Sequence, residues 1–439
     1  MTKANSPARR TLVLVMRRGL STSPDHVQTM LDLDIRTHLL TVDTEPWAND
    51  PRFASVRRLP HDADQRAFVR AAVEIARDRD ASAVVTFIEP DIEIVEEANA
   101  ELGLDWAIPE AARICRDKLR QRMFLAEHGI PSVWFHPVTD IESAVEAATA
   151  HGLPVMVKPT RAAASDCVEL VHDADRLRAS LKVVQSYIES GRNFYFSGAP
   201  ESWAVLEDYL PGEEVTLDGV VLDGRFVLGG VHNKKHSTGP HFEEDLYTLP
   251  FRTPEHEAEV AGIAADITRR LGVKHGLFNA ELRQDAQGRY RVVEFSVRVS
   301  GGHVYRHIKD VYAIDIVRMF LRAACGESAA DILAQENAKQ PPRMTVSAKV
   351  IYRNGRVVRN SVGEAMHSPY FRTYFPVAKP GTDVVSGENG FDFTGLLSVW
   401  HPWEPGQDPA VVHEVAHSLA EMLDVEVADP AGTHGQEAP

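Results

Sequence analysis

The feature that most constrains this fold is an alternation of short apolar runs and helical patterns over the first third of the chain. The apolar runs are "TLVLVM" (11–16), "THLLTVD" (37–43) and "ASAVVTFIE" (81–89), and the helical patterns cover 68–80 and 92–103. Strands that alternate with helices predict a parallel, doubly wound sheet. Ligands bind such sheets beyond the carboxyl ends of the strands, where Glu89 stands. Glu89 is therefore a candidate substrate residue, and a solvated loop acid is the alternative.

The rest of the chain changes from mixed helix and strand patterns to a β-rich pattern from about residue 340. The pattern predicts helices at 112–131, 140–151 and 254–271, a strand that carries Lys158 at its end, and three strands over 202–231 with hairpin signals at Pro211-Gly212 and Asp223-Gly224. We therefore expect an α/β and α+β multidomain chain with a doubly wound N-terminal domain and a β-rich C-terminal subdomain.

Composition excludes several classes of protein. The formal net charge of -16 argues against a protein that binds nucleic acid through a broad basic surface. Three widely spaced cysteines indicate free thiols in a reducing cytoplasm rather than disulfides or a zinc site. The apolar run near the N-terminus is too short for a signal peptide, and no stretch approaches a membrane span. We expect a cytoplasmic protein with no membrane partner.

A pair of polar stripes marks the predicted hairpin of residues 276–299. In "RVVEFSVRVSGGH" (291–303), period two puts Glu294, Ser296 and Arg298 on one face, and "LFNAEL" puts Asn279 and Glu281 on one face of its own strand. If the turn centres on Gln287-Gly288, Glu281 lies opposite Glu294. Two carboxylates that face each other repel unless a cation binds between them. Mg²⁺ is such a cation, and proteins usually bind it through one or two carboxylates together with substrate phosphates. The alternative is a solvated hairpin whose glutamates pair with arginine.

Four sequence pieces occur in one order along nearly the whole chain, and together they resemble the ATP-grasp superfamily. They are "RDKLRQRMFLAEHGIPSV" and "PVMVKP", which look like the two lysine segments, "VLEDYLPGEEV", which looks like the adenine hinge, and "AELRQDAQGRYRVVEFSVRVSGG", which looks like the family's metal-binding pair ending in E-x-N-x-R. The resemblance implies the ATP-grasp fold, with ATP and two Mg²⁺ ions as cofactors.

Carried over residue by residue, the resemblance assigns a role to each matching position. It implies that Lys118 and Lys158 bind the α- and β-phosphates, that Glu207, Asp208, Leu210 and Glu214 bind adenine and ribose, that Glu281, Glu294 and Ser296 bind metal, and that Arg298 stabilises the transferring phosphoryl group. Lys234 resembles a position near the γ-phosphate, and Lys235 competes with it. Both are expected to follow the strands of 202–231.

Two departures from the family pattern stand out. Ser296 occupies the position of the second metal-ligand asparagine, and a neutral hydroxyl is a weaker oxygen donor for Mg²⁺. The lid loop "RAAASDCV" (161–168) has no glycine, so we expect it to avoid positive φ. Either Arg161 or Ser165 helps this loop to bind phosphate, or the ATP site is impaired.

The whole-chain layout looks like the ligases that join amino acids to amines. The expected parts are a pre-ATP-grasp domain (1–112), a lid subdomain with its lead-in helix (113–203), a catalytic body (204–335), a C-terminal β-rich subdomain (336–430) and a disordered tail (431–439). The backbone N–H groups of Gly301 and Gly302 are candidates for binding the carboxylate substrate, and His303 for a further substrate contact.

This resemblance implies an acid–amino-acid ligase of specialised metabolism that forms an amide bond through an acyl phosphate and releases ADP and phosphate. Two alternatives stay open. One is a carboxylase-like or nucleotide-precursor ligase of the same fold, and the other is a non-catalytic ATP-binding regulatory protein. The expected partners are a small carboxylate and a small amine, with no nucleic acid, and a homodimer is one candidate for the oligomeric state.

Overall fold

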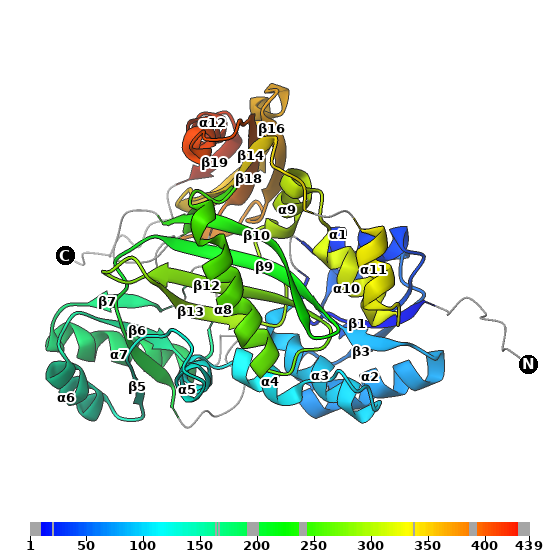
Figure 1. Ribbon diagram of the computed structural model, residues 1–439, viewed down its shortest axis with the longest axis horizontal. Coiled ribbons are helices and arrows are strands. Elements are labelled where there is room, and N and C mark those ends of the chain that lie inside the picture. The colour runs from blue at the N-terminus through cyan, green and yellow to red at the C-terminus, as the bar shows by residue number, and fades with distance from the viewer. Residues whose placement is uncertain are drawn as a thin grey trace, which may run out of the picture. The chain divides into compact units, whose positions relative to one another are not determined.

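The computed structural model of the chain describes residues 10–19, 22–162, 165, 167–190, 202–236, 244–336, 339–385 and 393–428. The fold divides into two units. The first comprises Met1–Val133, Leu210–Val231 and Thr253–Pro341, and the second comprises Trp134–Tyr209, His232–Arg252 and Pro342–Pro439. Figure 1 shows the fold and labels many of its helices and strands.

The first unit begins with a parallel four-stranded sheet in the order β3-β2-β1-β4. Its strands are β1 (Thr11–Val15), β2 (Arg36–Val42), β3 (Ser55–Leu59) and β4 (Ala83–Val85), and its helices are α1 (Ser23–Asp32), α2 (Gln65–Arg79) and α3 (Ile92–Glu101). Every residue of β1 is buried, as a strand covered on both faces requires. Val13 and Val15 pack against α2 and α3. The predicted doubly wound sheet is confirmed.

The order of the strands reverses between β1 and β4, so the crevice at their carboxyl ends is the switch point at which ligands bind such sheets. Glu89 begins the short 3₁₀ helix η2 (Glu89–Asp91) that follows β4. A second short 3₁₀ helix, η1 (Pro46–Asn49), follows β2.

The single helix predicted for 112–131 is wrong, because the structure has two helices there. They are α4 (Pro109–Cys115) and α5 (Lys118–Glu127). The Asp117 side chain caps α5 by accepting hydrogen bonds from the backbone N–H groups of Leu119 and Arg120. This break sets Lys118 at the first position of α5. Gly129, just beyond the end of α5, has φ +64°, a conformation that glycine adopts readily after a helix.

The remainder of the first unit is built on strands in the order β13-β12-β9-β10. The elements are β9 (Glu214–Leu222), the first part of β10 (Arg225–His236), η3 (Pro254–His256), α8 (Glu257–Arg270), β12 (Gly276–Gln284), β13 (Tyr290–Ser296), α9 (Val304–Tyr312), α10 (Ile316–Ala324) and α11 (Ala329–Gln335). Helix α10 packs on β9 and β12, and α8 packs on the same two strands.

The hairpin of β12 and β13 has the predicted register at one end only. Glu281 pairs with Glu294, as expected, and Asn279 pairs with Ser296. Beyond Glu281 the register shifts by one residue at a bulge, so that Leu282 pairs with Val292. The prediction is therefore correct at the polar end of the hairpin and wrong at the turn end.

The second unit contains an antiparallel sheet in the order β5-β8-β6-β7. Its elements are β5 (Phe135–Val138), α6 (Ile141–His151), β6 (Val155–Pro159), β7 (Glu169–Val171), α7 (Ala174–Glu189) and β8 (Ala204–Asp208). Helices α6 and α7 pack side by side beneath this sheet (Figure 1). Strand β8 belongs to this sheet and β9 to another, so the hairpin predicted at Pro211-Gly212 is wrong.

The β-rich pattern predicted from residue 340 is confirmed in the second unit. Strands pair antiparallel in the order β11-β14-β18-β16, and a smaller sheet has the order β17-β15-β19. The elements are β11 (Glu244–Leu249), β14 (Met344–Ile351), β15 (Gly355–Ser361), η4 (Gly363–His367), β16 (Phe371–Pro376), β17 (Asp383–Val384), β18 (Gly395–Pro402), η5 (Pro409–Val411), α12 (Val412–Glu421) and β19 (Asp424–Ala428). None of the helices in the described ranges has the length and apolarity to span a membrane.

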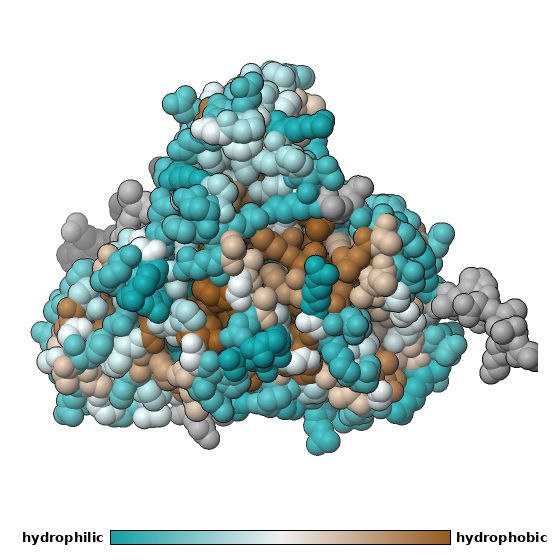
Figure 2. Space-filling view, viewed as in Figure 1, coloured by the Kyte–Doolittle hydropathy of each residue, from teal (hydrophilic) through white to brown (hydrophobic). Residues whose placement is uncertain are grey.

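Apolar surface remains on the first unit. Phe226, Val227 and Leu228, at the start of β10, are only half-buried. Figure 2 shows hydrophobic side chains gathered over β9 and β10. The expected tail, 431–439, lies outside the described residues.

Candidate active site

Two rows of polar side chains cross the same face of β9, β12 and β13. Cross-strand pairing aligns Thr216, Glu281 and Glu294 in one row, and Asp218, Asn279 and Ser296 in the next. Positions two apart on a strand share a face, so the two rows are neighbours. Sequence reasoning found only part of this face.

The first row carries the predicted pair of carboxylates. Glu281 and Glu294 are direct cross-strand neighbours, and the Lys118 ammonium donates to Glu294 Oε1 at 3.0 Å. Among the residues that the structure describes, no group of three or more His, Cys, Asp or Glu side chains is placed to hold a metal ion. Two carboxylates with the remaining oxygens from phosphates and water are the usual Mg²⁺ arrangement, so these residues fit that ion.

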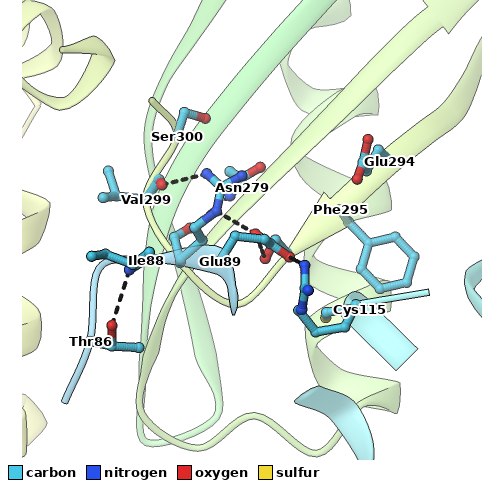
Figure 3. Close-up of polar contacts among 12 residues, drawn as sticks. Thr86, Ile88, Glu89, Cys115, Asn279, Glu294, Phe295, Val299 and Ser300 are labelled. Atoms are coloured by element: carbon cyan, nitrogen blue, oxygen red, sulfur yellow. Dashed lines mark hydrogen bonds and ion pairs between the residues drawn. The ribbon is translucent and has the colours of Figure 1, made fainter. Parts of the chain in front are cut away.

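The predicted residues Glu89, Ser296 and Arg298 lie together, although more than 200 residues separate Glu89 from the other two. Ser296 Oγ donates to Glu89 Oε2 at 2.8 Å, and Arg298 Nε donates to the same oxygen. Arg116 Nη1 lies 3.7 Å from Glu89 Oε1. Figure 3 marks these contacts around Glu89. The loop-acid alternative for Glu89 is therefore wrong, because its side chain is buried in this cluster.

The charge state of Glu89 follows from its neighbours. Burial alone would raise its pKa, but the positive charges of Arg298 and Arg116 and the hydrogen bond from Ser296 lower the pKa below its ordinary value. Glu89 is thus an anion that neutralises part of the charge of Arg298. This contact was not foreseen, because no local signal relates the switch point of the sheet to the end of β13.

The segment after Arg298 turns through two left-handed residues into α9. Gly302 and His303 have φ of +66° and +63°. A side-chain carbon added at Gly301 or Gly302 would meet nothing within 4 Å, so both glycines border open space. His303 is buried, and its Nδ1 lies 3.8 Å from Asp25 Oδ2. The structure therefore places the histidine against α1 and leaves the glycines accessible.

Two predicted nucleotide residues lie at the start of β9 or just before it. Glu214 begins β9 and is buried, and Arg283 Nη1 lies 3.4 Å from its Oε2. Arg283 Nε also donates to the backbone oxygen of Gly212 at 3.1 Å. Leu210 is buried in the same unit. The carboxylate of Glu214 is therefore held by an arginine from β12.

The other predicted nucleotide residues belong to the second unit. Lys158, on β6, donates to Glu207 Oε2 at 2.7 Å, and both side chains are buried. Asp208 accepts from the backbone N–H of Trp134 at 3.2 Å. Lys234 is half-buried on β10 with its ammonium 5.7 Å from the ring centre of Tyr247, whereas Lys235 is exposed.

The lid loop does adopt positive φ. Ser165 and Cys167 have φ of +57° and +54°, so the expectation that a glycine-free loop avoids this conformation is wrong. A single non-glycine residue in the left-handed region costs only about 1–2 kcal/mol, which the surrounding fold can offset. Residues 163, 164 and 166 of the loop lie outside the described residues.

Sequence reasoning did not single out Asp218 as a site residue, and it mentioned Asn279 only as a polar residue on the stripe. Asp218 is completely buried on β9, and burial raises its pKa to about 6. The sequence indicated that Asn279 shares a face with Glu281, because the two residues are two positions apart on one strand. Asp218 had a weaker signal, an acid inside the apolar run "VTLDGVVL". A charge in a fully buried strand requires a specific partner or function.

Comparison with known proteins assigns the class of this fold. Residues 151–306 match the family model described as an ATP-grasp domain. The structure is also similar to the L-amino acid ligase from Bacillus licheniformis, with a TM-score of 0.79 and 18% sequence identity over 97% of this chain and 100% of that one. The family match is limited to residues 151–306, and the structural likeness shows that the chain has the ATP-grasp fold.

The chain is also similar to particular proteins, in sequence and in structure. The sequence is 24% identical to alanine–anticapsin ligase from Bacillus subtilis over 285 residues, which cover 62% of this chain and 60% of the ligase. The match thus spans less than two thirds of that relative. The biotin carboxylase domain of 2-oxoglutarate carboxylase from Hydrogenobacter thermophilus, solved with ADP, magnesium and bicarbonate, has a TM-score of 0.69 at 16% identity over 94% of this chain and 90% of that one.

Proposed function

We propose that this chain is an ATP-dependent ligase that joins the carboxylate of an amino acid, or a similar carboxylate, to an amine in specialised metabolism. The observation that carries the proposal is the polar face of the first unit, where Glu281 lies opposite Glu294 and Lys118 bonds to Glu294. Arg298 follows two residues after the end of β13. Two carboxylates beside a lysine and an arginine are what the transfer of a phosphoryl group requires.

The roles follow from the charges. Glu281 and Glu294 hold Mg²⁺, with the Ser296 hydroxyl as a weaker third oxygen. When bound, the two expected ions neutralise the charge on the phosphates of ATP. Lys118 moves from Glu294 to the phosphates, because the metal then satisfies that carboxylate. Arg298 stabilises the charge on the transferring group.

The reaction has two steps. A carboxylate oxygen of the substrate attacks the γ-phosphorus, the bond to the bridging oxygen of ADP breaks, and an acyl phosphate forms. The amine nitrogen then attacks the acyl carbon, phosphate leaves, and the nitrogen loses a proton. Gly301 and Gly302 border open space and present backbone N–H groups to the acyl oxygen. Glu89 supports this end of the site by holding Ser296 and Arg298.

The proposal gives nucleotide-binding roles to residues of each unit, taken by itself. In the second unit, Lys158 and Lys234 bind phosphate, Glu207 and Asp208 bind the adenine edge, and Ser165 supports the lid. In the first unit, Leu210 and Glu214 bind adenine and ribose respectively. Carboxylates suit ribose hydroxyls and the adenine amino group because they accept hydrogen bonds.

The experiment is a measurement of ADP and phosphate release with pools of amino acids, combined with mass spectrometry of the products. We expect ADP, phosphate and an amide in equal amounts, only when both a carboxylate and an amine are present. Arg298→Lys serves as the matched variant, because it keeps one charge but loses the fork of the guanidinium. Its turnover should fall at least tenfold.

Other outcomes would replace the proposal. Phosphate release that depends on bicarbonate would support the carboxylase-like reading, for which the likeness to the biotin carboxylase domain is fold-level support. Tight binding of ATP without ADP formation, across all pools, would support a regulatory protein. An amide formed without ATP would contradict a phosphoryl-transfer mechanism.

A further inference from the structure

The backbone on either side of Val299 is held by two side chains from neighbouring strands. Asn279 Nδ2, on β12, donates to the backbone oxygen of Arg298 at 2.8 Å. Asp218 Oδ1, on β9, accepts from the backbone N–H of Ser300 at 2.7 Å. Asn279 is drawn beside the Val299–Ser300 segment in Figure 3. These hydrogen bonds fix the backbone of this segment to the sheet.

The same segment also fixes the guanidinium of Arg298. Arg298 Nη1 donates to the backbone oxygen of Val299 at 2.8 Å, and Nε donates to Glu89. The orientation of the side chain thus depends on where the Arg298–Ser300 backbone lies. Anything that releases Ser300 from Asp218 removes the restraint on the Val299 carbonyl, and with it one of the contacts that aim the guanidinium.

Burial makes both restraints rigid. Asp218 is 0% exposed and Asn279 is 6% exposed, so water does not compete for either hydrogen bond. Asp218 Oδ2 is buried with no hydrogen-bond partner among the described residues. Only Oδ1 is therefore used, and an amide side chain of the same shape would supply the same acceptor.

We propose that Asp218 and Asn279 are positioning residues that aim Arg298 at the transferring phosphoryl group by holding the Arg298–Ser300 backbone, an inference that rests on the proposed ligase function. Neither residue contacts substrate, and each acts through Arg298. A displacement of about 1 Å at a reacting group can cost about 100-fold in rate, so a restraint of this kind has a measurable kinetic effect.

The kinetic test uses substitutions of similar size with opposite predicted results. Asp218→Asn keeps an acceptor for the Ser300 N–H, so kcat should stay within about threefold of the wild type. Asp218→Leu and Asn279→Leu remove the acceptor and the donor, so kcat should fall about 10- to 100-fold. The KM for ATP should stay unchanged in all three, because the nucleotide contacts are intact. Thermal unfolding of each variant confirms that it is folded.

A second readout does not depend on turnover. Hydrogen exchange of the Ser300 amide should be slow in the wild type and in Asp218→Asn, and at least tenfold faster in Asp218→Leu. Fast exchange in the wild type, or wild-type kcat in Asp218→Leu, would overturn the positioning role. An equal loss of kcat in Asp218→Asn and Asp218→Leu would also overturn it, because charge would then be the cause. If the wild type consumes no ATP with any pool, the proposed function fails, while Ser300 exchange still decides whether Asp218 holds the segment.

Discussion

Each unit contains one ion pair between a lysine and a glutamate that the sequence marked as site residues, Lys118 with Glu294 and Lys158 with Glu207, and the two pairs differ in one respect. Lys118 Nζ lies 3.0 Å from Glu294 Oε1, and Lys158 Nζ lies 2.7 Å from Glu207 Oε2. The side chain of Glu294 is 33% exposed, whereas that of Glu207 is 1% exposed. The acid of the pair is thus partly exposed to solvent in the first unit and fully buried in the second.

From the sequence, Lys118 and Lys158 are expected to have the same role, but their glutamate partners are buried to different extents in the fold. Lys118 is the first residue of a helix, and its partner Glu294 lies opposite Glu281 on the neighbouring strand. The ion pair of Lys158 and Glu207 links strand β6 to strand β8. In the register of these two strands, the residue directly opposite Glu207 is Met156. Breaking a fully buried pair leaves an uncompensated charge in the core, whereas a half-exposed pair is solvated when it breaks. The four predictions below start from this contrast.

The largest effect is expected for Glu294→Gln. This substitution removes a negative charge that belongs both to the ion pair with Lys118 and to the proposed metal site. Turnover should fall by about 10³-fold, because the metal that stabilises the transferring group is lost. Steady-state ADP release measures this change. Glu364→Gln, an exposed substitution on η4, is the control and should have wild-type activity. Full activity in Glu294→Gln would contradict the metal assignment.

The buried pair of Lys158 and Glu207 should instead have its main effect on the free energy of unfolding. Lys158→Met leaves Glu207 charged and unpaired in the core, so the free energy of unfolding should fall by about 3–5 kcal/mol. Urea unfolding measures this difference. The double variant Lys158→Met with Glu207→Leu removes both charges and should recover most of the loss. Equal stability of the single variant and the wild type would mean that the pair is solvated.

Lys118→Met should change stability little and should mainly weaken the binding of ATP. The free energy of unfolding should change by less than about 1 kcal/mol, since Glu294 is half-exposed and is solvated once the lysine is gone. The KM for ATP should rise about tenfold, because a phosphate-binding charge is lost. Parallel unfolding and kinetic measurements on Lys118→Met and Lys158→Met compare the pairs directly. The same stability loss in both variants would remove the contrast.

A smaller, pH-dependent effect is expected for a carboxyl group whose partner is a backbone N–H rather than a lysine. Ile108 N–H donates to Glu96 Oε2 at 2.8 Å, and burial raises the pKa of Glu96 to about 7. The protonated form is thus favoured in the folded state. Its contribution to stability is complete below about pH 4.5, the ordinary pKa, and is lost as the pH rises through about 7.

Glu96→Gln should therefore stabilise the protein at pH 8 by about 1–2 kcal/mol relative to the wild type, and the gain should disappear near pH 4.5. Unfolding free energies across this pH range test the sign. Glu97→Gln on the same helix is the control, because Glu97 lies beside Arg113 and lacks this backbone contact. A gain that is independent of pH would mean that Glu96 does not titrate in this range.

The sequence predicted the parts of the site that follow from local periodicity. Period two and a single turn were enough to place Glu281 opposite Glu294, and the resemblance supplied the roles of the lysines and arginine. The bulge after Glu281 was not predictable, because it shifts the register without changing the alternation at the polar end. The break before Lys118 was missed for a similar reason, since the amphipathic pattern continues across the capping Asp117.

The rest of the site depends on pairings between distant segments. Glu89 meets Ser296 only after the N-terminal sheet and β13 have folded, and Asp218 becomes part of the site only because β9 pairs with β12. Neither pairing leaves a local signal in the sequence. The parallel sheet was predictable because its strands and helices alternate over short distances, whereas the separation of β8 from β9 was hidden by a turn sequence that also suits a hairpin.

The most direct test of the account is the transfer of oxygen from the carboxylate substrate to phosphate. With a carboxylate labelled with ¹⁸O, an acyl phosphate mechanism requires that each phosphate released carries one labelled oxygen, because the oxygen that attacks the γ-phosphorus leaves with it. We predict one label per phosphate, in proportion to the amide formed, and no label with Glu294→Gln. Unlabelled phosphate accompanied by amide would contradict the proposed mechanism.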